Sequence, residues 1–166
     1  MSRFKTSQTY KALGLHVGFL PGLMNYTGIT EFEGLAMPIA VHEGTAELNK
    51  VLRSSSKDRI AVVDGRYLGS TAVVGREEIV SAVAGGCKAL IVLGLVTERA
   101  AVEMSRIAVL ASGHTPKAPS PDIGSAKPAL IDIDGGKISA EHYIVVDSDG
   151  VVAVEREIYQ ARFPIK

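Results

Sequence analysis

The chain of 166 residues contains one cysteine, no tryptophan and no excess of either charge. Cys87 cannot form an internal disulfide and follows Ala-Gly-Gly at an expected helix end, so we interpret it as a small packed residue of a cytoplasmic protein. Because 18 basic residues balance 18 acidic ones, no net field attracts nucleic acid or an anionic membrane. No apolar run reaches about 18 residues, so no membrane span is expected.

Common site motifs are also missing. The sequence has no Gly-x-Gly-x-x-Gly after a strand, no Gly-x-x-x-x-Gly-Lys, no Cys-x-x-Cys and no His-Glu-x-x-His, which disfavours nucleotide and zinc sites. Asp132 with Asp134, and Asp147 with Asp149, stand at expected hairpins, where aspartate bonds its own backbone; turn roles are therefore favoured over cation binding. Four scattered histidines are interpreted as surface or structural residues: His16, His42, His114 and His142.

The most regular pattern lies in the middle of the chain. Apolar runs predict strands at 59–63, 89–93 and 107–111. Between them, helical spacing predicts one helix opened at Gly75 and closed by two glycines, and a second helix over 97–106. Such alternation of strands and helices is typical of parallel pairing with right-handed crossovers.

The flanking segments have different patterns. Residues 1–33 suggest an irregular segment, with one short helix at most, packed on the rest. Residues 35–41 predict a strand that Pro38 assigns to an edge or a bulge, and Thr45 is the expected N-cap of a helix over 46–52. Glycine-containing hairpin turns at 134–136 and 148–150 predict an antiparallel layer, whose strands are expected at 129–133, 137–139, 143–147 and 151–154. We therefore expect one α/β domain over residues 1–166.

The junction at Gly75 is the best candidate for a ligand site. The next three residues, Arg76, Glu77 and Glu78, have backbone N–H groups without partners inside the helix. A helix start of this kind binds a carboxylate or phosphate, because the free donors and the helix dipole act together. The next strand ends at Gly94, so in a parallel sheet its turn, with Thr97, Glu98 and Arg99, would lie beside Gly75.

Several segments, in their order and spacing, resemble the RraA-like family, which includes class II pyruvate aldolases and the protein regulator of ribonuclease E. The resemblance is carried by residues 34–41, 59–65, 75–82, 89–94 and 147–154 and covers about residues 34–158. It implies a swivelling β/β/α domain that forms homotrimers, or hexamers of paired trimers, with sites at subunit boundaries. In the family's aldolases, the helix start matching Gly75, Arg76, Glu77 and Glu78 binds the pyruvyl carboxylate.

The chain departs from the family pattern at the turn after the next strand. The pattern Asp-Gly-x-x-Arg-Asp reads Leu93-Gly94-Leu95-Val96-Thr97-Glu98 here. In the family the arginine polarises the keto oxygen and the last aspartate helps to hold a divalent metal. Glu98 could still bind Mg²⁺ or Mn²⁺ through oxygen, whereas Thr97 carries no charge. Arg99 or Arg76 would have to replace the missing arginine.

Three functions follow as hypotheses. The first is a divergent lyase, of aldolase or decarboxylase type, that acts on a small anionic keto compound at the Gly75 helix start. The second is a non-catalytic regulator that binds another protein of RNA degradation. The third is a repurposed lyase or cyclase of a biosynthetic pathway that uses Glu98, Arg76 and histidines for proton transfer. The expected partners are further copies of the chain, a small anion and, for a regulator, a protein, but not nucleic acid directly.

Overall fold

The computed structural model describes residues 5–165 of the chain. Its helices are α1 (Lys5–Leu13), α2 (Ala46–Ser55), α3 (Arg76–Ala84), α4 (Arg99–Glu103) and α5 (Arg156–Arg162), with short 3₁₀ turns η1 (Gly14–His16) and η2 (Arg66–Leu68). Its strands are β1 (Gly18–Phe19), β2 (Met24–Asn25), β3 (Phe32–His42), β4 (Arg59–Asp64), β5 (Ala72–Val74), β6 (Ala89–Val96), β7 (Ala108–His114), β8 (Ser125–Pro128), β9 (Ile131–Ile133), β10 (Gly136–Ile138), β11 (His142–Asp147) and β12 (Gly150–Glu155). The predicted combination of parallel units and an antiparallel layer is confirmed.

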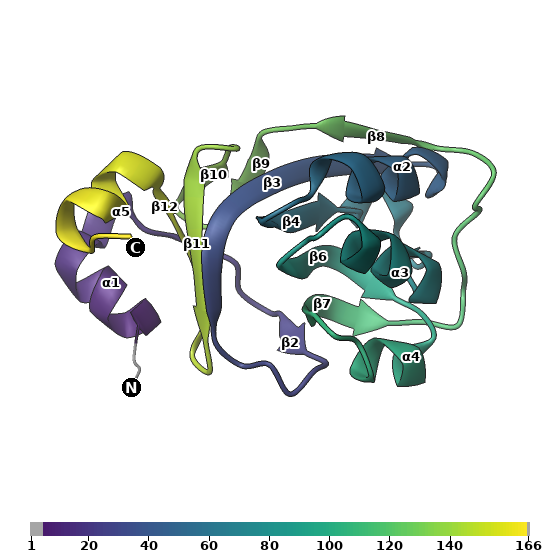
Figure 1. Cartoon of the computed structure of the whole chain (residues 1–166), viewed down its shortest axis with the longest axis horizontal. Coiled ribbons are helices and arrows are strands. Elements are labelled where there is room, and N and C mark those ends of the chain that lie inside the picture. The colour runs from purple at the N-terminus through teal and green to yellow at the C-terminus, as the bar shows by residue number, and fades with distance from the viewer. Residues whose placement is uncertain (1–4, 166) are drawn as a thin grey trace.

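One curled mixed sheet organises these elements. Its strand order is β1-β12-β11-β3-β4-β6-β7-β2, with β5 added to β6 and β8 added to β3. The central strands β3, β4, β6 and β7 run parallel, whereas β11 and β8 pair antiparallel with successive parts of the other edge of β3. The long strand β3 thus joins the parallel part, at the right of Figure 1, to the antiparallel part near its centre.

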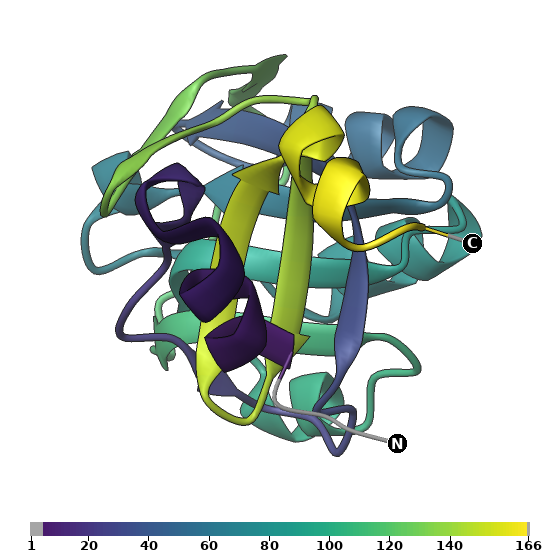
Figure 2. The same cartoon turned by 90° about the vertical axis from the view of Figure 1, so that its left-hand side faces the viewer.

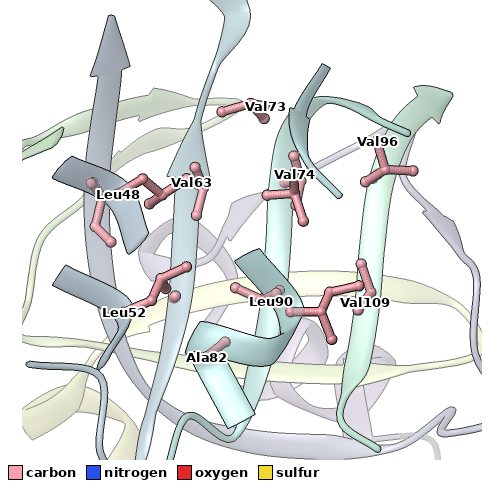
Figure 3. Close-up of a cluster of buried hydrophobic side chains, with 14 of the residues drawn as sticks. Leu48, Leu52, Val63, Val73, Val74, Ala82, Leu90, Val96 and Val109 are labelled. Atoms are coloured by element: carbon pink, nitrogen blue, oxygen red, sulfur yellow. The ribbon is translucent and has the colours of Figure 1, made fainter. Parts of the chain in front are cut away.

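The parallel strands are buried on both faces, which explains their nearly continuous apolar sequences. Helices α2, α3 and α4 cover one face, where Leu48, Leu52 and Ala82 pack against residues of β4 to β7 such as Val63 and Leu90 (Figure 3). The other face lies under the small β9–β10 hairpin and residues of β11 and β12. The strand ends that carry the candidate site are therefore held by a core on each side.

The N-terminal and C-terminal helices lie together on the antiparallel part (Figure 2). Stacked rings of Tyr143 and Tyr159, with centroids 4.6 Å apart, fix α5 to β11. The α1 helix is fixed by Asp147, whose carboxylate accepts hydrogen bonds from the Thr6 backbone N–H at 2.9 Å and hydroxyl at 2.8 Å, and also from the Asp149 N–H. Asp147 thus bonds the backbone of its own turn, as expected, and also holds α1 against the sheet.

The structure corrects several expectations about single elements. Residues 5–33 hold the nine-residue helix α1 and two short strands, β1 and β2, which are too short to produce a periodic pattern. Pro38 lies inside the central strand β3 and not in an edge strand; it is tolerated because β11 pairs with β3 only up to Leu35 and β8 only from Ile39. Thr45 does precede α2, but its side chain makes no capping hydrogen bond there.

Differences also occur at the ends of the predicted elements. The helix expected over 97–106 is only α4, since Glu98 adopts a left-handed conformation with φ of 56° before the helix begins. The strand expected over 129–133 is shortened to β9, and neither β8, which precedes it, nor α5 was predicted. Among residues 5–165, no helix is long and apolar enough to cross a membrane.

Close packing between α2 and the end of α3 leads to a stability prediction. A Cβ built on Gly85 would overlap the Leu52 carbonyl oxygen and lie 2.8 Å from Ser56 Oγ. We expect Gly85→Ala to lower the free energy of unfolding by about 2 to 3 kcal/mol, as overpacking does. Urea denaturation measures this. The control is Gly28→Ala, where nothing lies within 4 Å of the new carbon; equal stability of both variants would contradict the prediction.

Candidate functional site

The candidate site forms where β5 and β6 end side by side. The Thr97 backbone N–H, just after β6, donates to the Val74 carbonyl oxygen at 2.9 Å, just before Gly75. The chain therefore brings the turn after β6 to the start of α3, as parallel pairing of the two units predicts. Thr97 is buried, with 7% of its surface exposed, whereas Glu98 is exposed.

Gly75 allows this approach because it has no side chain. A Cβ at Gly75 would lie 2.9 Å from Thr97 Cγ2 and 3.1 Å from Glu98 Oε1, too close for any other residue without movement. Thr97 thus packs directly on the helix start, and the Glu98 carboxylate lies beside it. These contacts bring Gly75, Thr97 and Glu98 together as the sequence predicts, while their roles remain predictions.

The start of α3 keeps some donors free. The first hydrogen bond within the helix runs from the Ile79 N–H to the Gly75 carbonyl at 3.2 Å, so the three preceding N–H groups have no acceptor in the helix. The Glu78 carboxylate folds back and accepts from the Gly75 N–H at 3.2 Å. It also interacts with its own N–H. The N–H groups of Arg76 and Glu77, on exposed residues, have no acceptor within the helix.

Glu78 is an unusual group at such a position, because its side chain is buried. Only 3% of its surface is exposed, and this burial raises the pKa of its carboxyl above the ordinary value, although hydrogen bonds from the Gly75 N–H and the Thr45 side chain oppose the shift. We predicted from the sequence that Glu78 binds the ligand, whereas its observed contacts are those of a helix cap.

Within the described residues, neither arginine considered as a replacement forms a hydrogen bond or an ion pair with Thr97 or Glu98. The Arg99 side chain donates to Glu103 Oε1 at 2.7 Å, lies 3.5 Å from His114 Nε2, and its Cζ stands 5.7 Å from the centre of the Tyr26 ring. These partners place Arg99 toward β7, on the other side of β6 from β5 and Gly75. Arg76 is exposed and lines a groove between α3 and α4.

Sequence reasoning missed two clusters at this edge of the sheet. Asp64, at the end of β4, accepts two hydrogen bonds of 2.9 Å from the Arg66 guanidinium, although the sequence suggested only a turn there. Tyr26 Oη lies 2.9 Å from His114 Nδ1, and burial raises the pKa of Tyr26 despite the nearby Arg99 charge. Asp64 directly follows a predicted strand, which was a usable signal. His114 lies beyond the predicted end of the strand at 107–111, and Tyr26 lies in a segment without periodicity.

The available donors limit the kind of metal that fits. Within residues 5–165, no group of three or more His, Cys, Asp or Glu side chains could hold a metal ion. Glu98 and Glu78 nevertheless place carboxylate oxygens 3.1 and 3.8 Å from the Cβ position of Gly75. Only Glu98 of the two is exposed, since Glu78 is buried and accepts from the Gly75 N–H. A single carboxylate fits a hydrated Mg²⁺ or Mn²⁺, because Mg²⁺ keeps several waters and takes one or two carboxylates.

Comparison with known proteins assigns the family. The sequence model of the RraA-like family, described as Aldolase/RraA, matches residues 6–153. The chain belongs to the RraA-like family, which confirms the resemblance seen in the sequence. A Laribacter hongkongensis protein named "Putative 4-hydroxy-4-methyl-2-oxoglutarate aldolase" is 26% identical over 133 residues, which are 80% of this chain and 83% of that protein.

Solved structures share the fold. A Geobacillus kaustophilus protein named S-adenosylmethionine:2-dimethylmenaquinone methyltransferase superposes with a TM-score of 0.80 and 22% identity, over 92% of this chain and 96% of its own. The RNA-processing inhibitor RraA from Thermus thermophilus gives a TM-score of 0.78 and 23% identity, over 93% of each chain. Such different names on one fold show that function must be argued from the site.

The burial of Glu78 predicts a pH-dependent stability. Because the folded-state pKa is raised, the folded protein holds this proton more tightly than the unfolded chain. The stabilisation of the folded state by this proton is therefore fully present below the pKa that Glu78 has in the unfolded chain. It is lost as pH rises through the pKa that Glu78 has in the folded protein. We expect Glu78→Gln to raise the unfolding midpoint in urea more at pH 7 than at pH 4. The exposed neighbour serves as control, so an equal response of Glu77→Gln would contradict the assignment.

Proposed function

We propose that the chain is a divergent RraA-like lyase, of aldolase or decarboxylase type, which acts on a small anionic keto compound at the start of α3. The observation that carries the proposal is the convergence of the free Arg76 and Glu77 N–H groups with the Glu98 carboxylate around Gly75. The name of the Laribacter hongkongensis relative supports the same class of reaction.

The chain's own residues would act mainly by binding and orientation. The N–H groups of Arg76 and Glu77 bind the substrate carboxylate, and the positive end of α3 favours its charge. Thr97 packs against Gly75 and shields one side of this position without adding charge. The substrate keto group is thereby directed toward Glu98, an exposed carboxylate whose Oε1 lies 3.1 Å from the Cβ position of Gly75.

Glu98 would hold the divalent cation, whereas Glu78 is buried and accepts from the Gly75 N–H. Cleavage next to a ketone leaves an enolate, and its developing negative charge needs a fixed positive partner. A bound Mg²⁺ or Mn²⁺ supplies Lewis-acid stabilisation of that charge. This requirement is stricter here than in the family pattern, because Thr97 stands in place of the arginine.

We also propose that the chain assembles into homotrimers, or hexamers of paired trimers, in the cytoplasm, as the family resemblance implies. A second candidate function is a regulator that binds a protein. It is favoured by the exposed apolar groove between α3 and α4, and by the name of the Thermus thermophilus structure, an RNA-processing inhibitor. The two functions differ in whether Glu98 and a metal are needed.

Pyruvate release from oxaloacetate and from 4-hydroxy-4-methyl-2-oxoglutarate tests the lyase. We expect turnover by the native protein only with Mg²⁺ or Mn²⁺, and a loss of at least about 100-fold in Glu98→Ala, since a metal ligand supports several kcal/mol of charge stabilisation. Thr97→Arg is expected to raise kcat, because it restores a cation beside the keto oxygen.

The matched control for Glu98→Ala is Glu157→Ala, an exposed glutamate on α5, which should retain native activity. Absence of turnover by both the native protein and Thr97→Arg, with either metal, would contradict the lyase. Turnover by Thr97→Arg alone would mean that the substitution has disabled the site in this chain.

A further inference from the structure

A groove between α3 and α4 lies apart from the Gly75 contacts. It has a volume of about 700 Å³, and its walls are mostly apolar. Its apolar lining includes Ile79, Val80 and Val83 from α3, and Ala100, Ala101 and Met104 from α4 and the residue after it. Figure 1 shows both helices on the same face of the sheet.

Two large apolar side chains of this groove are exposed on opposite walls. Val80 exposes 51% of its surface, and Met104 exposes 84%. Ile79 and Ala82 are the residues of α3 that pack into the core under the helix, whereas Val80 is not part of that core. Methionine adapts its shape to different partners, and a concave apolar surface of this kind is a common docking site for an amphipathic helix.

An arginine stands at each end of the groove. Helices α3 and α4 both run from the end of one parallel strand toward the start of the next, so Arg76 at the start of α3 and Arg106 after the end of α4 lie at opposite ends. The length of α3 separates these ends by about 12 Å. Within the part of the chain that the structure describes, neither guanidinium has an ion pair or a hydrogen-bond acceptor.

We propose that this groove binds an amphipathic helical segment of a protein partner, with apolar residues flanked by acidic residues about two helical turns apart. The apolar walls match the middle of such a segment, and the two free arginines match its ends. Pairing of the groove with the same groove of a second copy about a two-fold axis is disfavoured, because Arg76 of one copy would face Arg106 of the other. A three-fold assembly would instead bring a different surface of the chain to the groove, and sedimentation of Met104→Glu distinguishes that occupant from a partner protein. The inference does not rest on lyase activity, since it uses neither Glu98 nor a metal.

The probe is a fluorescein-labelled, twelve-residue helical peptide with three leucines on one face between two glutamates seven residues apart. A second peptide carries lysines in place of the glutamates. We expect fluorescence anisotropy to show binding of the glutamate peptide, at least tenfold tighter than that of the lysine peptide. Met104→Glu should weaken binding at least tenfold, whereas Leu15→Glu, at a fully exposed leucine outside the groove, should not.

Charge reversal makes the test specific for the arginines. Arg106→Glu is expected to weaken binding of the glutamate peptide and to strengthen binding of the lysine peptide. Arg106→Gln should change both affinities in the same directions but by smaller factors, because it removes the positive charge without adding a negative one. Circular dichroism checks that each variant is folded. Equal affinity for both peptides would overturn the proposal. A loss of native subunit association in Met104→Glu, measured by sedimentation, would also overturn it, because a second copy of the chain would then fill the groove.

Discussion

The structure depends on the pairing of β3 with different partners along its two edges. One edge lies parallel to β4 from Leu35 to Ala40, while the other pairs antiparallel with β11 and then with β8. Eleven residues of one strand thus fix the register of both parts of the sheet. A one-residue shift would exchange the faces of Ala36 and Ile39 and would therefore disrupt the cores on both sides.

This arrangement also places the candidate site. Because β3, β4 and β6 are in parallel register, the strand ends that follow them lie along one edge of the sheet. A bulge after Val92 divides the pairing between β6 and β7 into two parts. The second part of β6 pairs with β5, and α3 begins directly after β5. The contact between Thr97 and Gly75 is the local result of this chain of pairings.

The sequence predicted the parallel units well because their strands are uniform apolar runs and their turns contain glycine. It failed where tertiary contacts replace local signals. Pro38 would normally mark an edge, but a gap between β11 and β8 accommodates it inside the sheet. The α5 helix is short and is stabilised by the stacking of Tyr159 on Tyr143, which no local pattern reveals.

The candidate site was predictable in position but not in charge. Parallel topology was enough to bring Thr97 and Glu98 to Gly75, whereas the direction of a long side chain depends on its neighbours. Arg99 was a reasonable replacement for the missing arginine by proximity in sequence. Its contacts with Glu103, Tyr26 and His114 turn it toward β7 instead, and two of those partners come from distant segments.

The electrostatic balance at α3 decides what the site can bind. The helix start contributes about half a positive charge, while Glu78 and Glu98 place two carboxyl groups within 4 Å of the Cβ position of Gly75. Burial favours the protonated form of Glu78, which removes part of this negative charge, but Glu98 is exposed. An anionic keto compound would therefore be repelled by Glu98 unless a cation lay between them. The replacement of arginine by Thr97 thus makes the proposed reaction depend on a metal for binding as well as for chemistry.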